Sequence, residues 1–359
     1  MSDGMHYAPV AQAQKPVCEP GEFGFAVTAL DHGHIFGMAQ NLKQAGATCL
    51  WVHDPDPAKV ETFLRLNPGV KVARELSQIL QDPDVKLVAA AAVPNLRAEL
   101  GLVVMQHNKD YFTDKTPFTT LAQLEAARLA VRASGQKYAC CYSERLQNEA
   151  AEYATQLISG GAIGRVLQVI GLGPHRLNAK ARPAWFFDKA KYGGIICDIG
   201  SHQMEQFLTY TGASDAEITM ARVTNYHHPD FPELEDFGEC AVLGDNGASG
   251  YCRMDWFTPD GLRTWGDGRT TILGTDGYIE LRKYIDVAAA ERRENNVYIV
   301  TGEGEEYHNV TGKVGFPFFG QFVLDCLNRT ELAMSQAHCF KAAELCLRAQ
   351  ALADQTNTG

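Results

Sequence analysis

The stretch that most constrains the fold covers residues 23–54. It opens with a short apolar run typical of a β-strand, passes through the turn Asp31–Gly37, and continues with apolar residues at helical spacing before a second β-type run. This order predicts a β-α-β unit. Asp54 follows Gly33 by 21 residues, a spacing at which dinucleotide-binding units place an acid for the ribose hydroxyls.

The turn of this unit departs from the usual glycine pattern, because G-x-G-x-x-G is absent. Ala29 stands where the first glycine is expected, and Asp31 and His32 occupy the turn before Gly33. Asp31 could cap the helix, and His32 and His34 could donate hydrogen bonds to phosphate oxygens. Two interpretations stay open from this stretch alone: a phosphate-binding turn, or a β-α-β unit that binds nothing.

The next hundred residues continue the alternation of strands and helices. Strands are predicted at 70–73, 85–93, 110–114 and 137–142, and helices at 57–67, 96–107 and 121–134. Such alternation favours a doubly wound parallel sheet, so the α/β Rossmann domain is expected to cover residues 23–145. Ligands of these sheets lie beyond the carboxyl ends of the strands, where Pro94-Asn95, Asp114–Pro117 and Ser143–Arg145 are found.

The character of the chain changes after residue 145. A helix is followed by β-type segments at hairpin spacing, and two helices close the chain. We therefore expect an α+β domain over residues 146–359, with an open, mainly antiparallel sheet. Residues 1–22 mix Pro, Gln, Ala and Gly and are predicted to be a flexible tail.

Composition limits the possible partners and the compartment. A length of 359 residues with 45% hydrophobic content suffices for two cores. The net charge of -11 argues against nucleic acid or an anionic membrane as a partner. No run of 18 apolar residues or signal-type leader is seen, so a cytoplasmic protein is expected. The ten cysteines contain no C-x-x-C, which favours reduced, buried thiols, Cys197 included.

Two stretches carry residues suited to catalysis. Lys115 directly follows a predicted buried strand, where it could polarise a substrate oxygen, although a surface lysine is the alternative. Asp198 and His202 are four residues apart in an apolar-periodic segment. On one helix face they would form a pair suited to taking a proton from a hydroxyl. The alternative is a helix-capping Asp198 with a His202 at the edge of the core.

These stretches together resemble the Gfo/Idh/MocA family of NAD(P)-dependent sugar and polyol oxidoreductases. The family's E-K-P appears as Asp114-Lys115 with Thr116 before Pro117, and its D-x-x-x-H appears as Asp198 and His202. The segments Gly161–Arg165 and Glu235–Phe237 are also similar to the family's. The resemblance spans about residues 23–354 and implies a Rossmann domain followed by a domain with an open sheet.

The resemblance also implies roles for individual residues. Hydride would pass between a substrate carbon and C4 of nicotinamide, with Lys115 holding the reacting oxygen, His202 as general base and Asp198 as its partner. Asp54 would bind the adenosine ribose, and because Pro55 follows it, NAD is favoured over NADP. The full set of expected cofactor-binding residues is Asp31, His32, Gly33, His34, Ile35, Asp54, Pro94, Asn95, Asp114 and Lys115.

Further residues of the second domain are candidates for substrate binding. His175, Arg182 and Trp185 lie in aromatic and basic segments that could stack on a sugar and bind its hydroxyls, together with His202, although packing is the alternative for each. His227-His228 and the acids behind it fit a solvated loop better than a metal cluster, so no metal site is predicted. Arg97 stands where the family often has histidine and is expected to matter for packing.

Three functional hypotheses follow. The first is an NAD-dependent dehydrogenase of a sugar, polyol or sugar acid. The second keeps the same site but recycles a tightly bound NAD during elimination, epimerisation or glycoside cleavage, and the third is a non-catalytic NAD-binding regulator. A sheet with one uncovered face, like the resemblance itself, favours a homodimer or homotetramer.

Overall fold

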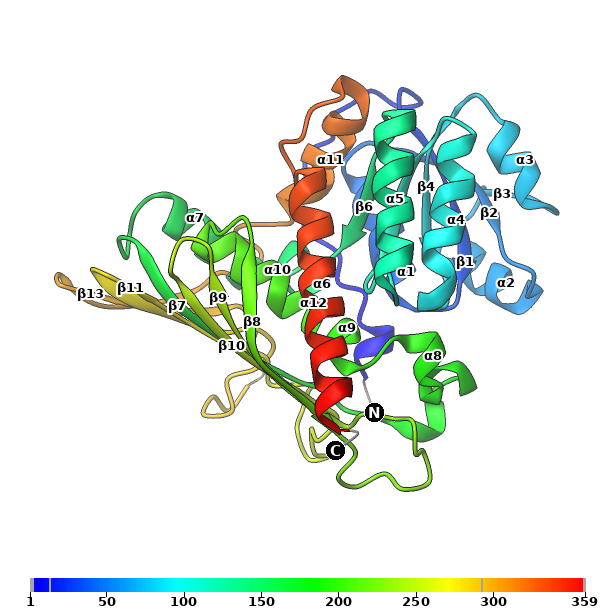
Figure 1. Cartoon of the computed structure of the whole chain (residues 1–359). Helices are drawn as coiled ribbons and strands as arrows, with labels where there is room; N and C mark the ends of the chain where they lie inside the picture. Colours follow the sequence, from blue (N-terminus) through cyan, green and yellow to red (C-terminus); the bar gives the residue numbers. More distant parts are fainter. Residues whose placement is uncertain (1–2, 13, 292, 358–359) are drawn as a thin grey trace. The chain divides into compact units, whose positions relative to one another are not determined.

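The computed structural model describes residues 3–12, 14–291 and 293–357. The chain divides into two units (Figure 1). The Rossmann unit comprises residues 5–141 and 316–340, and the sheet unit comprises the described part of residues 1–4, 142–315 and 341–359. The division differs from the expected boundary at residue 145, because a C-terminal segment belongs with the N-terminal sheet.

The Rossmann unit holds a parallel sheet that, in the described part of the chain, has six strands in the order β3-β2-β1-β4-β5-β6. Its strands are β1 (Gly24–Leu30), β2 (Thr48–His53), β3 (Lys71–Val72), β4 (Val85–Ala91), β5 (Asp110–Asp114) and β6 (Tyr138–Cys141). The order reverses between β1 and β4, which is the switch point where such sheets bind ligands. The predicted doubly wound parallel sheet is confirmed.

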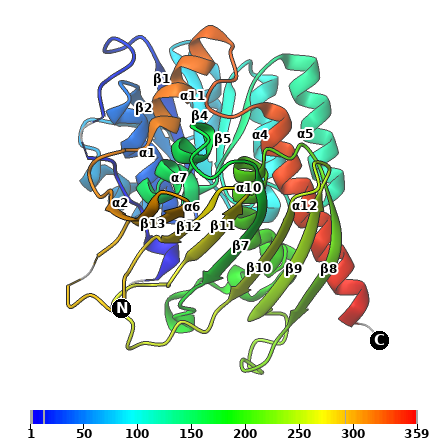
Figure 2. The same cartoon turned by 90° about the vertical axis from the view of Figure 1, so that its left-hand side faces the viewer.

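Helices cover both faces of this sheet (Figures 1 and 2). Helices α1 (His34–Gln44) and α11 (Pro317–Asn328) pack together on one side, and α4 (Pro94–Gln106) and α5 (Leu121–Ser134) pack together on the other. Helices α2 (Pro57–Leu66) and α3 (Leu76–Gln81) complete the unit.

Local sequence explains several of these elements. Asp56 caps α2 by accepting from the Ala58 backbone N–H, and Thr120 forms a capping box at the start of α5. The C-terminal segment joins this unit through aromatic packing on β5. Its phenylalanines surround the Phe112 ring at centroid distances of 5.9, 6.1 and 5.2 Å; they are Phe318, Phe319 and Phe322.

The sheet unit is built on a larger sheet, with eight strands among the described residues in the order β14-β13-β12-β11-β7-β10-β9-β8. Only the β7–β10 pair in it is parallel, so the predicted mainly antiparallel sheet is confirmed. The strands are β7 (Val166–Pro174), β8 (Ala216–Thr224), β9 (Phe237–Gly244), β10 (Ser249–Asp255), β11 (Arg269–Gly274), β12 (Gly277–Arg282), β13 (Asn296–Thr301) and β14 (Gly304–Asn309). Strand β14 was not predicted, because its polar residues give no apolar alternation.

Helices pack on one face of this sheet, namely α7 (Glu149–Ser159), α9 (Ile195–Asp198) and α10 (Gly200–Thr211). Figure 2 looks onto the opposite face, over which no helix of the described chain lies. The remaining helices are α6 (Ser143–Leu146), α8 (Lys189–Tyr192), α12 (Gln336–Asn357) and the short 3-10 helices η1 (Gly4–His6), η2 (Ala179–Ala181) and η3 (Ala184–Phe187).

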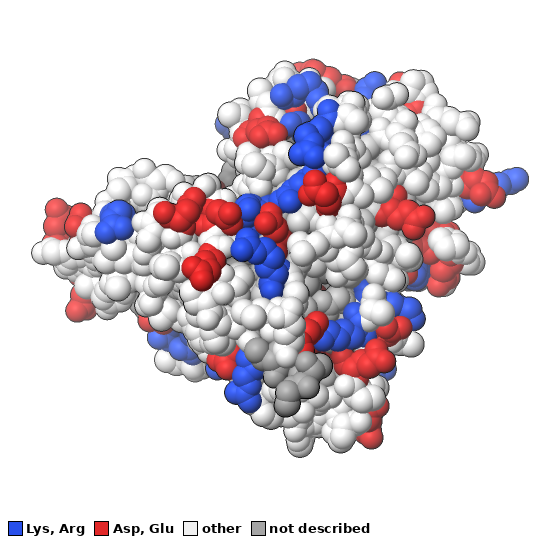
Figure 3. Space-filling view, viewed as in Figure 1, with Lys and Arg blue, Asp and Glu red and all other residues white. Residues whose placement is uncertain are grey.

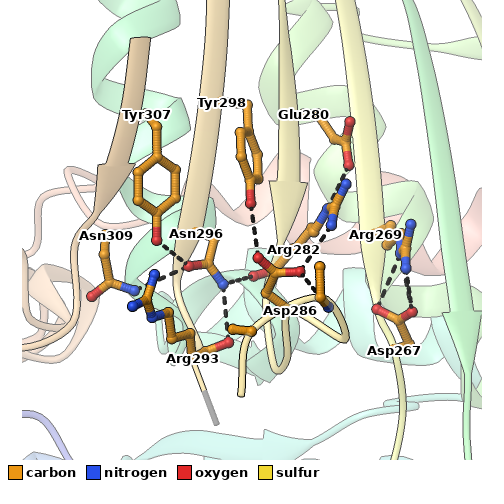
Figure 4. A network of polar contacts seen from close by, with 12 residues as sticks. Asp267, Arg269, Glu280, Arg282, Asp286, Arg293, Asn296, Tyr298, Tyr307 and Asn309 are labelled. Atoms are coloured by element: carbon orange, nitrogen blue, oxygen red, sulfur yellow. Dashed lines mark hydrogen bonds and ion pairs between the residues drawn. The ribbon is translucent and has the colours of Figure 1, made fainter. Parts of the chain in front are cut away.

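One end of the helix-free face carries a polar network (Figure 4). Arg282 donates to Glu280 at 2.8 Å and to Asp286 at 3.0 Å, and Tyr298 donates to Asp286 at 3.3 Å. Over β12 and β13, the helix-free face therefore presents paired charges rather than a continuous apolar surface. In the view of Figure 1, acidic and basic side chains are likewise interspersed on the surface (Figure 3).

Two bulk expectations can be compared with the structure. No helix in the described chain is long and apolar enough to cross a membrane. All ten cysteines are free, and most are buried. Burial raises the pKa of the Cys197 thiol, as expected for a packing residue.

Candidate cofactor and substrate sites

A cavity of about 440 Å³ lies in the Rossmann unit, beside the ends of β1 and β2. Its walls combine acidic and apolar side chains and are formed by Ala29, Asp31, Asp54, Pro55, Asp56, Lys59, Leu76, Ala92, Leu96, Glu99, Leu100 and Val103. An apolar slot with carboxylates at its wall fits a nucleoside, whose base is flat and whose ribose donates hydroxyl hydrogen bonds.

Asp54 is fixed at the wall of this cavity. Its Oδ2 accepts from the Leu30 backbone N–H at 2.6 Å and its Oδ1 from the Asp56 N–H at 2.9 Å. Lys59 lies 2.6 Å from Asp31 and 3.9 Å from Asp54. The three acids Asp31, Asp54 and Asp56 outnumber this lysine, so the wall favours ribose hydroxyls over an added phosphate.

The turn between β1 and α1 has an unusual backbone. Ala29, which stands in the first glycine position, has a φ of 52°, and the pairing of β1 with β4 shifts register there. The left-handed region is the one in which glycine is preferred. The sequence shows that Ala29 replaces the expected glycine. Only the structure shows that Ala29 keeps the left-handed backbone conformation that favours glycine.

Gly33 is the N-cap residue of α1, and the N-terminal segment lies against it. A Cβ at Gly33 would come within 2.5 Å of the Met5 carbonyl oxygen. Farther along, the Asn41 side chain donates to the Pro9 carbonyl at 2.9 Å and accepts from the Ala11 N–H at 3.0 Å. The segment that the sequence predicts to be a flexible tail therefore packs over α1 in this structure.

Asp114, the last residue of β5, is the centre of a buried charged cluster. It accepts from His34 Nδ1 at 2.9 Å and from the Lys115 backbone N–H at 2.8 Å, and it lies 3.2 Å from His32 Nδ1 and 3.4 Å from Arg97 Nη2. Burial opposes its charge, but the two histidines and Arg97 outweigh burial and hold its pKa well below the usual range. Asp114 is therefore an ionised anchor for the turn.

The two histidines thus face Asp114 through Nδ1. Burial, reinforced by His34, lowers the pKa of His32 well below 6.5, so its imidazole is neutral near pH 7. Ligand atoms of His32, His34 and Asp114 lie within 4.8 Å of one another, as a metal triad would require. Arg97 already neutralises this carboxylate, which disfavours a further cation there.

Arg97 has a larger role than packing, because it holds the loop that carries Lys115. It is fully buried and donates to the carbonyl oxygens of Ala92 at 2.7 Å, Thr116 at 3.2 Å and Lys115. Lys115 itself is buried. The sequence gives no sign of this role, because the arginine and the loop lie on different elements.

The remaining predicted cofactor residues lie at helix starts. Pro94 and Asn95 open α4, and Ile35 is buried in the first turn of α1. Asn95 Oδ1 is buried and has no hydrogen-bond partner within the described chain. An unpartnered acceptor of this kind fits a group that a bound ligand supplies.

In the sheet unit, Asp198 is the last residue of α9 and His202 lies in the first turn of α10. The predicted single helix is thus divided at Ile199, whose backbone angles remain helical (φ -81°, ψ -39°). Both side chains are buried, and Ser201 Oγ donates to the Asp198 carbonyl at 2.8 Å. Asp198 and His202 therefore remain about one helical turn apart, although they belong to two helices.

His175 and Arg182 come together around one aromatic ring. The Trp256 ring centroid lies 5.4 Å from that of His175 and 5.1 Å from Arg182 Cζ. Arg182 also lies over Phe186, at 4.5 Å, whereas Trp185 is half-buried beside Phe186 at 5.8 Å. A buried cation and an imidazole among aromatic rings suit a polyhydroxylated ligand.

A buried polar network supports His175 and was missed in the sequence. Glu144 accepts from Lys283 Nζ at 3.1 Å and from Gln203 Nε2 at 3.1 Å, and its other oxygen lies 3.9 Å from His175 Nε2.

The loop that contains His227 and His228 is arranged differently. His228 contacts Asp236 at 2.8 Å, and Asp236 also accepts from the Tyr226 and His227 N–H groups. That loop uses its acid to order its own backbone.

Comparison with known proteins decides the family. Residues 151–280 match the model of the GFO/IDH/MocA C-terminal domain. A putative oxidoreductase from Erwinia carotovora atroseptica SCRI1043 has a solved structure that is 49% identical, with a TM-score of 0.89, over 92% of this chain and 99% of that one. This chain belongs to the Gfo/Idh/MocA family.

More distant relatives agree with this assignment. The scyllo-inositol 2-dehydrogenase (NAD(+)) of Bacillus subtilis (strain 168) is 22% identical over 73% of this chain and 72% of its own. A levoglucosan dehydrogenase solved with NADH and levoglucosan shares the fold, with a TM-score of 0.77 and 16% identity over 93% and 97% of the two chains. The predicted family and the predicted oxidoreductase class are confirmed.

Proposed function

We propose that this protein is an NAD-dependent dehydrogenase that oxidises a hydroxyl-bearing carbon of a sugar, polyol or sugar acid. The observation that carries the proposal is the cavity beside β1 and β2, with Asp54 fixed in its wall. Its apolar walls and its acid suit the adenosine part of the cofactor. Relatives named as NAD(+)-dependent and NADH-bound dehydrogenases support the same chemistry.

The cofactor would be held by residues of the Rossmann unit. Asp54 would accept hydrogen bonds from the ribose, and the buried Asn95 Oδ1 would accept one from the cofactor. The excess of acid around Asp54 disfavours the additional phosphate of NADP. Bound NAD supplies the acceptor of a hydride, at C4 of its nicotinamide.

The protein's own residues would handle the proton. His202 would take the hydroxyl proton as the carbon loses its hydride, and Asp198 would stabilise the imidazolium that forms. Lys115 would hold and polarise the reacting oxygen, and it can do so only if its loop is fixed. The bonds from Arg97 to the carbonyl oxygens of Lys115 and Thr116 provide that fixation.

We also infer that the protein is a homo-oligomer, as expected from the sequence.

The primary experiment follows absorbance of NADH while the purified protein meets NAD and a panel of sugars, polyols, inositols and sugar acids. We expect the band to grow with at least one member. A flat response with NAD shown to bind would instead favour an internally recycled cofactor or a regulator.

Lys115→Ala tests the assigned role directly. Turnover should be abolished while NAD affinity stays within about tenfold, or about 1.4 kcal/mol. The matched control is Lys86→Ala, because Lys86 is exposed and donates to the nearby Pro83 carbonyl at 2.9 Å. Undiminished turnover of the Lys115 variant would remove the lysine from the mechanism.

A further inference from the structure

Lys283 directly follows β12 and is a fully buried cation of the sheet unit. Side chains alternate along this strand: Ile279 and Leu281 are buried, whereas Arg282 belongs to the polar network of the helix-free face (Figure 4). Lys283 therefore stands at a position where the alternation favours an apolar side chain. A buried ammonium group is costly unless it is paired, so its partners are informative.

The ammonium group of Lys283 donates two hydrogen bonds that lead to α10. Nζ donates to Gln206 Oε1 at 2.7 Å, and Gln206 Nε2 in turn donates to the His202 carbonyl oxygen at 2.9 Å. Nζ also donates to Glu144 Oε2 at 3.1 Å, and the same oxygen accepts from Gln203 Nε2 at 3.1 Å. Lys283 is thus linked to the backbone of His202 and to the side chain of the next residue.

The sheet side of these contacts is fixed through the backbone. The Lys283 N–H donates to the Gly268 carbonyl at 3.1 Å, and the Lys283 carbonyl accepts from the Asn295 N–H at 2.8 Å. On β7, a Cβ at Gly171 would come within 2.1 Å of Gln203 Oε1, so the glycine leaves the room that this side chain takes. The bonds from Lys283 therefore tie α10 to a rigid part of the sheet unit.

His202 lies where such support matters. It is in the first turn of α10, and helix ends fray more readily than helix centres. The same lysine also reaches the second candidate histidine, because the other oxygen of Glu144 lies 3.9 Å from His175 Nε2. Replacing a buried ion pair by apolar side chains is often neutral or stabilising, so stability alone does not account for a lysine here.

We propose that Lys283 is a positioning residue of the candidate active site, which holds His202 through Gln206 and, through Glu144, the neighbouring Gln203 and His175. This inference rests on the proposed function, since it concerns the placement of the general base of that reaction. Lys283 does not touch the substrate. It fixes the backbone from which the His202 imidazole reaches the hydroxyl proton.

Crystal structures of the wild type and of Lys283→Met, each with NAD, test this placement without requiring turnover. We expect the His202 imidazole of the variant to move by about 1 Å or more, a misplacement that costs on the order of a hundredfold in rate. With the substrate found by the absorbance panel, kcat should fall about a hundredfold while KM stays within about threefold, because the lost contacts act on the reaction step.

Lys313→Met is the matched control. Lys313 is an exposed lysine of the same unit and donates to the Asn309 carbonyl at 2.7 Å. Its removal should leave both kcat and the place of the His202 imidazole unchanged.

Two further variants separate positioning from stability. Gln206→Glu keeps an acceptor for Lys283 but removes the donor to the His202 carbonyl, so kcat should fall while the melting temperature stays close to that of the wild type. Lys283→Met alone leaves the Glu144 carboxylate buried without its cation and should lower the melting temperature. Adding Glu144→Gln to it removes that charge, so the melting temperature should recover while kcat stays low.

The inference is overturned if the His202 imidazole keeps its wild-type place in both Lys283→Met and Gln206→Glu, or if kcat recovers together with the melting temperature in the double variant. If Lys283→Met does not fold, Gln206→Glu and the double variant carry the same test. The NADH absorbance assay judges the proposed function separately. A wild type without turnover counts against that function and leaves the crystal structures to decide the role of Lys283, whereas an active wild type with unmoved imidazoles in the variants would retain the function and lose that role.

Discussion

Asp54 and Asp114 both stand at the carboxyl end of a strand of the same parallel sheet, β2 and β5, yet their surroundings differ. Asp54 directly follows β2, is 9% exposed and faces a cavity, with two backbone N–H groups as donors. Asp114 ends β5, is 0% exposed and is surrounded by two imidazoles and a guanidinium. A carboxylate at a strand end can thus serve a ligand or hold the protein together, and burial separates the two cases.

The largest effect is expected from Asp114→Asn. The substitution removes the charge that compensates Arg97 and the acceptors of both histidines, which should lower the free energy of unfolding by about 3–5 kcal/mol. Denaturant unfolding measures this. Asp84→Asn, on an exposed residue of the same unit, should change it by less than about 0.5 kcal/mol. A loss below about 1 kcal/mol for the Asp114 variant would show that the cluster is not a structural anchor.

Asp54→Asn should affect the ligand rather than the fold. We expect NAD affinity to fall about tenfold, equivalent to about 1.4 kcal/mol, and the preference for NAD over NADP to shrink, because one negative charge leaves the cavity wall. Fluorescence titration with both nucleotides measures the two changes. Glu61→Gln, on an exposed position of α2, controls for the change of net charge. An unaltered NAD affinity would contradict the placement of the ribose at Asp54.

Acidification should weaken the Asp114 cluster before Asp114 itself is protonated. An unfolded histidine titrates near pH 6.5, whereas burial lowers the pKa of His32 in the folded state. Below pH 6.5 the unfolded state therefore binds more protons than the folded state. The free energy of unfolding should decrease as the pH is lowered, by at most about 1.4 kcal/mol at pH 5.5. The stabilisation from the lowered pKa of Asp114 is lost at lower pH, below its unfolded value of about 3.9.

Melting temperatures between pH 7.5 and 5.5 test this expectation. His32→Asn should flatten the profile, whereas His107→Asn, at an exposed position, should not. A wild-type profile that is flat in this window would show that His32 is not kept neutral by the fold.

The smallest effect concerns Ala29. Because its φ of 52° suits glycine, Ala29→Gly should raise the free energy of unfolding by about 0.5–1 kcal/mol. Ala26→Gly, in the same strand and without a positive φ, should lower it instead. Equal destabilisation by both substitutions would mean that the turn carries no backbone strain.

Much of the fold was accessible from sequence because its signals are local. The β-strand runs, the helical spacing after the turn and the position of Lys115 after β5 depend on neighbouring residues, and the structure contains them. The division of the helix at Ile199 and the polar strand β14 were not predicted. Neither has a distinctive pattern over a few residues.

The details of the candidate site depend on contacts that are distant in sequence. His32 and His34 were expected at a phosphate, but they face Asp114, 80 residues beyond His34. Arg97 was expected to matter for packing, yet it also donates to the carbonyl oxygens of Lys115 and Thr116 in the loop. Such networks arise only once the strands are aligned, so no spacing rule could find them. The assigned roles of the predicted site residues stay predictions for the experiments above.

The packing of Asp3 and Gly4 has a practical consequence for handling the protein. Asp3 accepts from Asn178 Nδ2 at 2.8 Å and Gly4 lies against His175, so residues of a purification tag fused just ahead of Asp3 would lie beside this packed segment. Residues added there would compete with Asp3 and Gly4 for the surface of His175 and Asn178. A tag after the carboxyl end, beyond the exposed Gln355, avoids that competition. Weak turnover by an amino-terminally tagged preparation would therefore be attributed first to the tag and not to the enzyme itself.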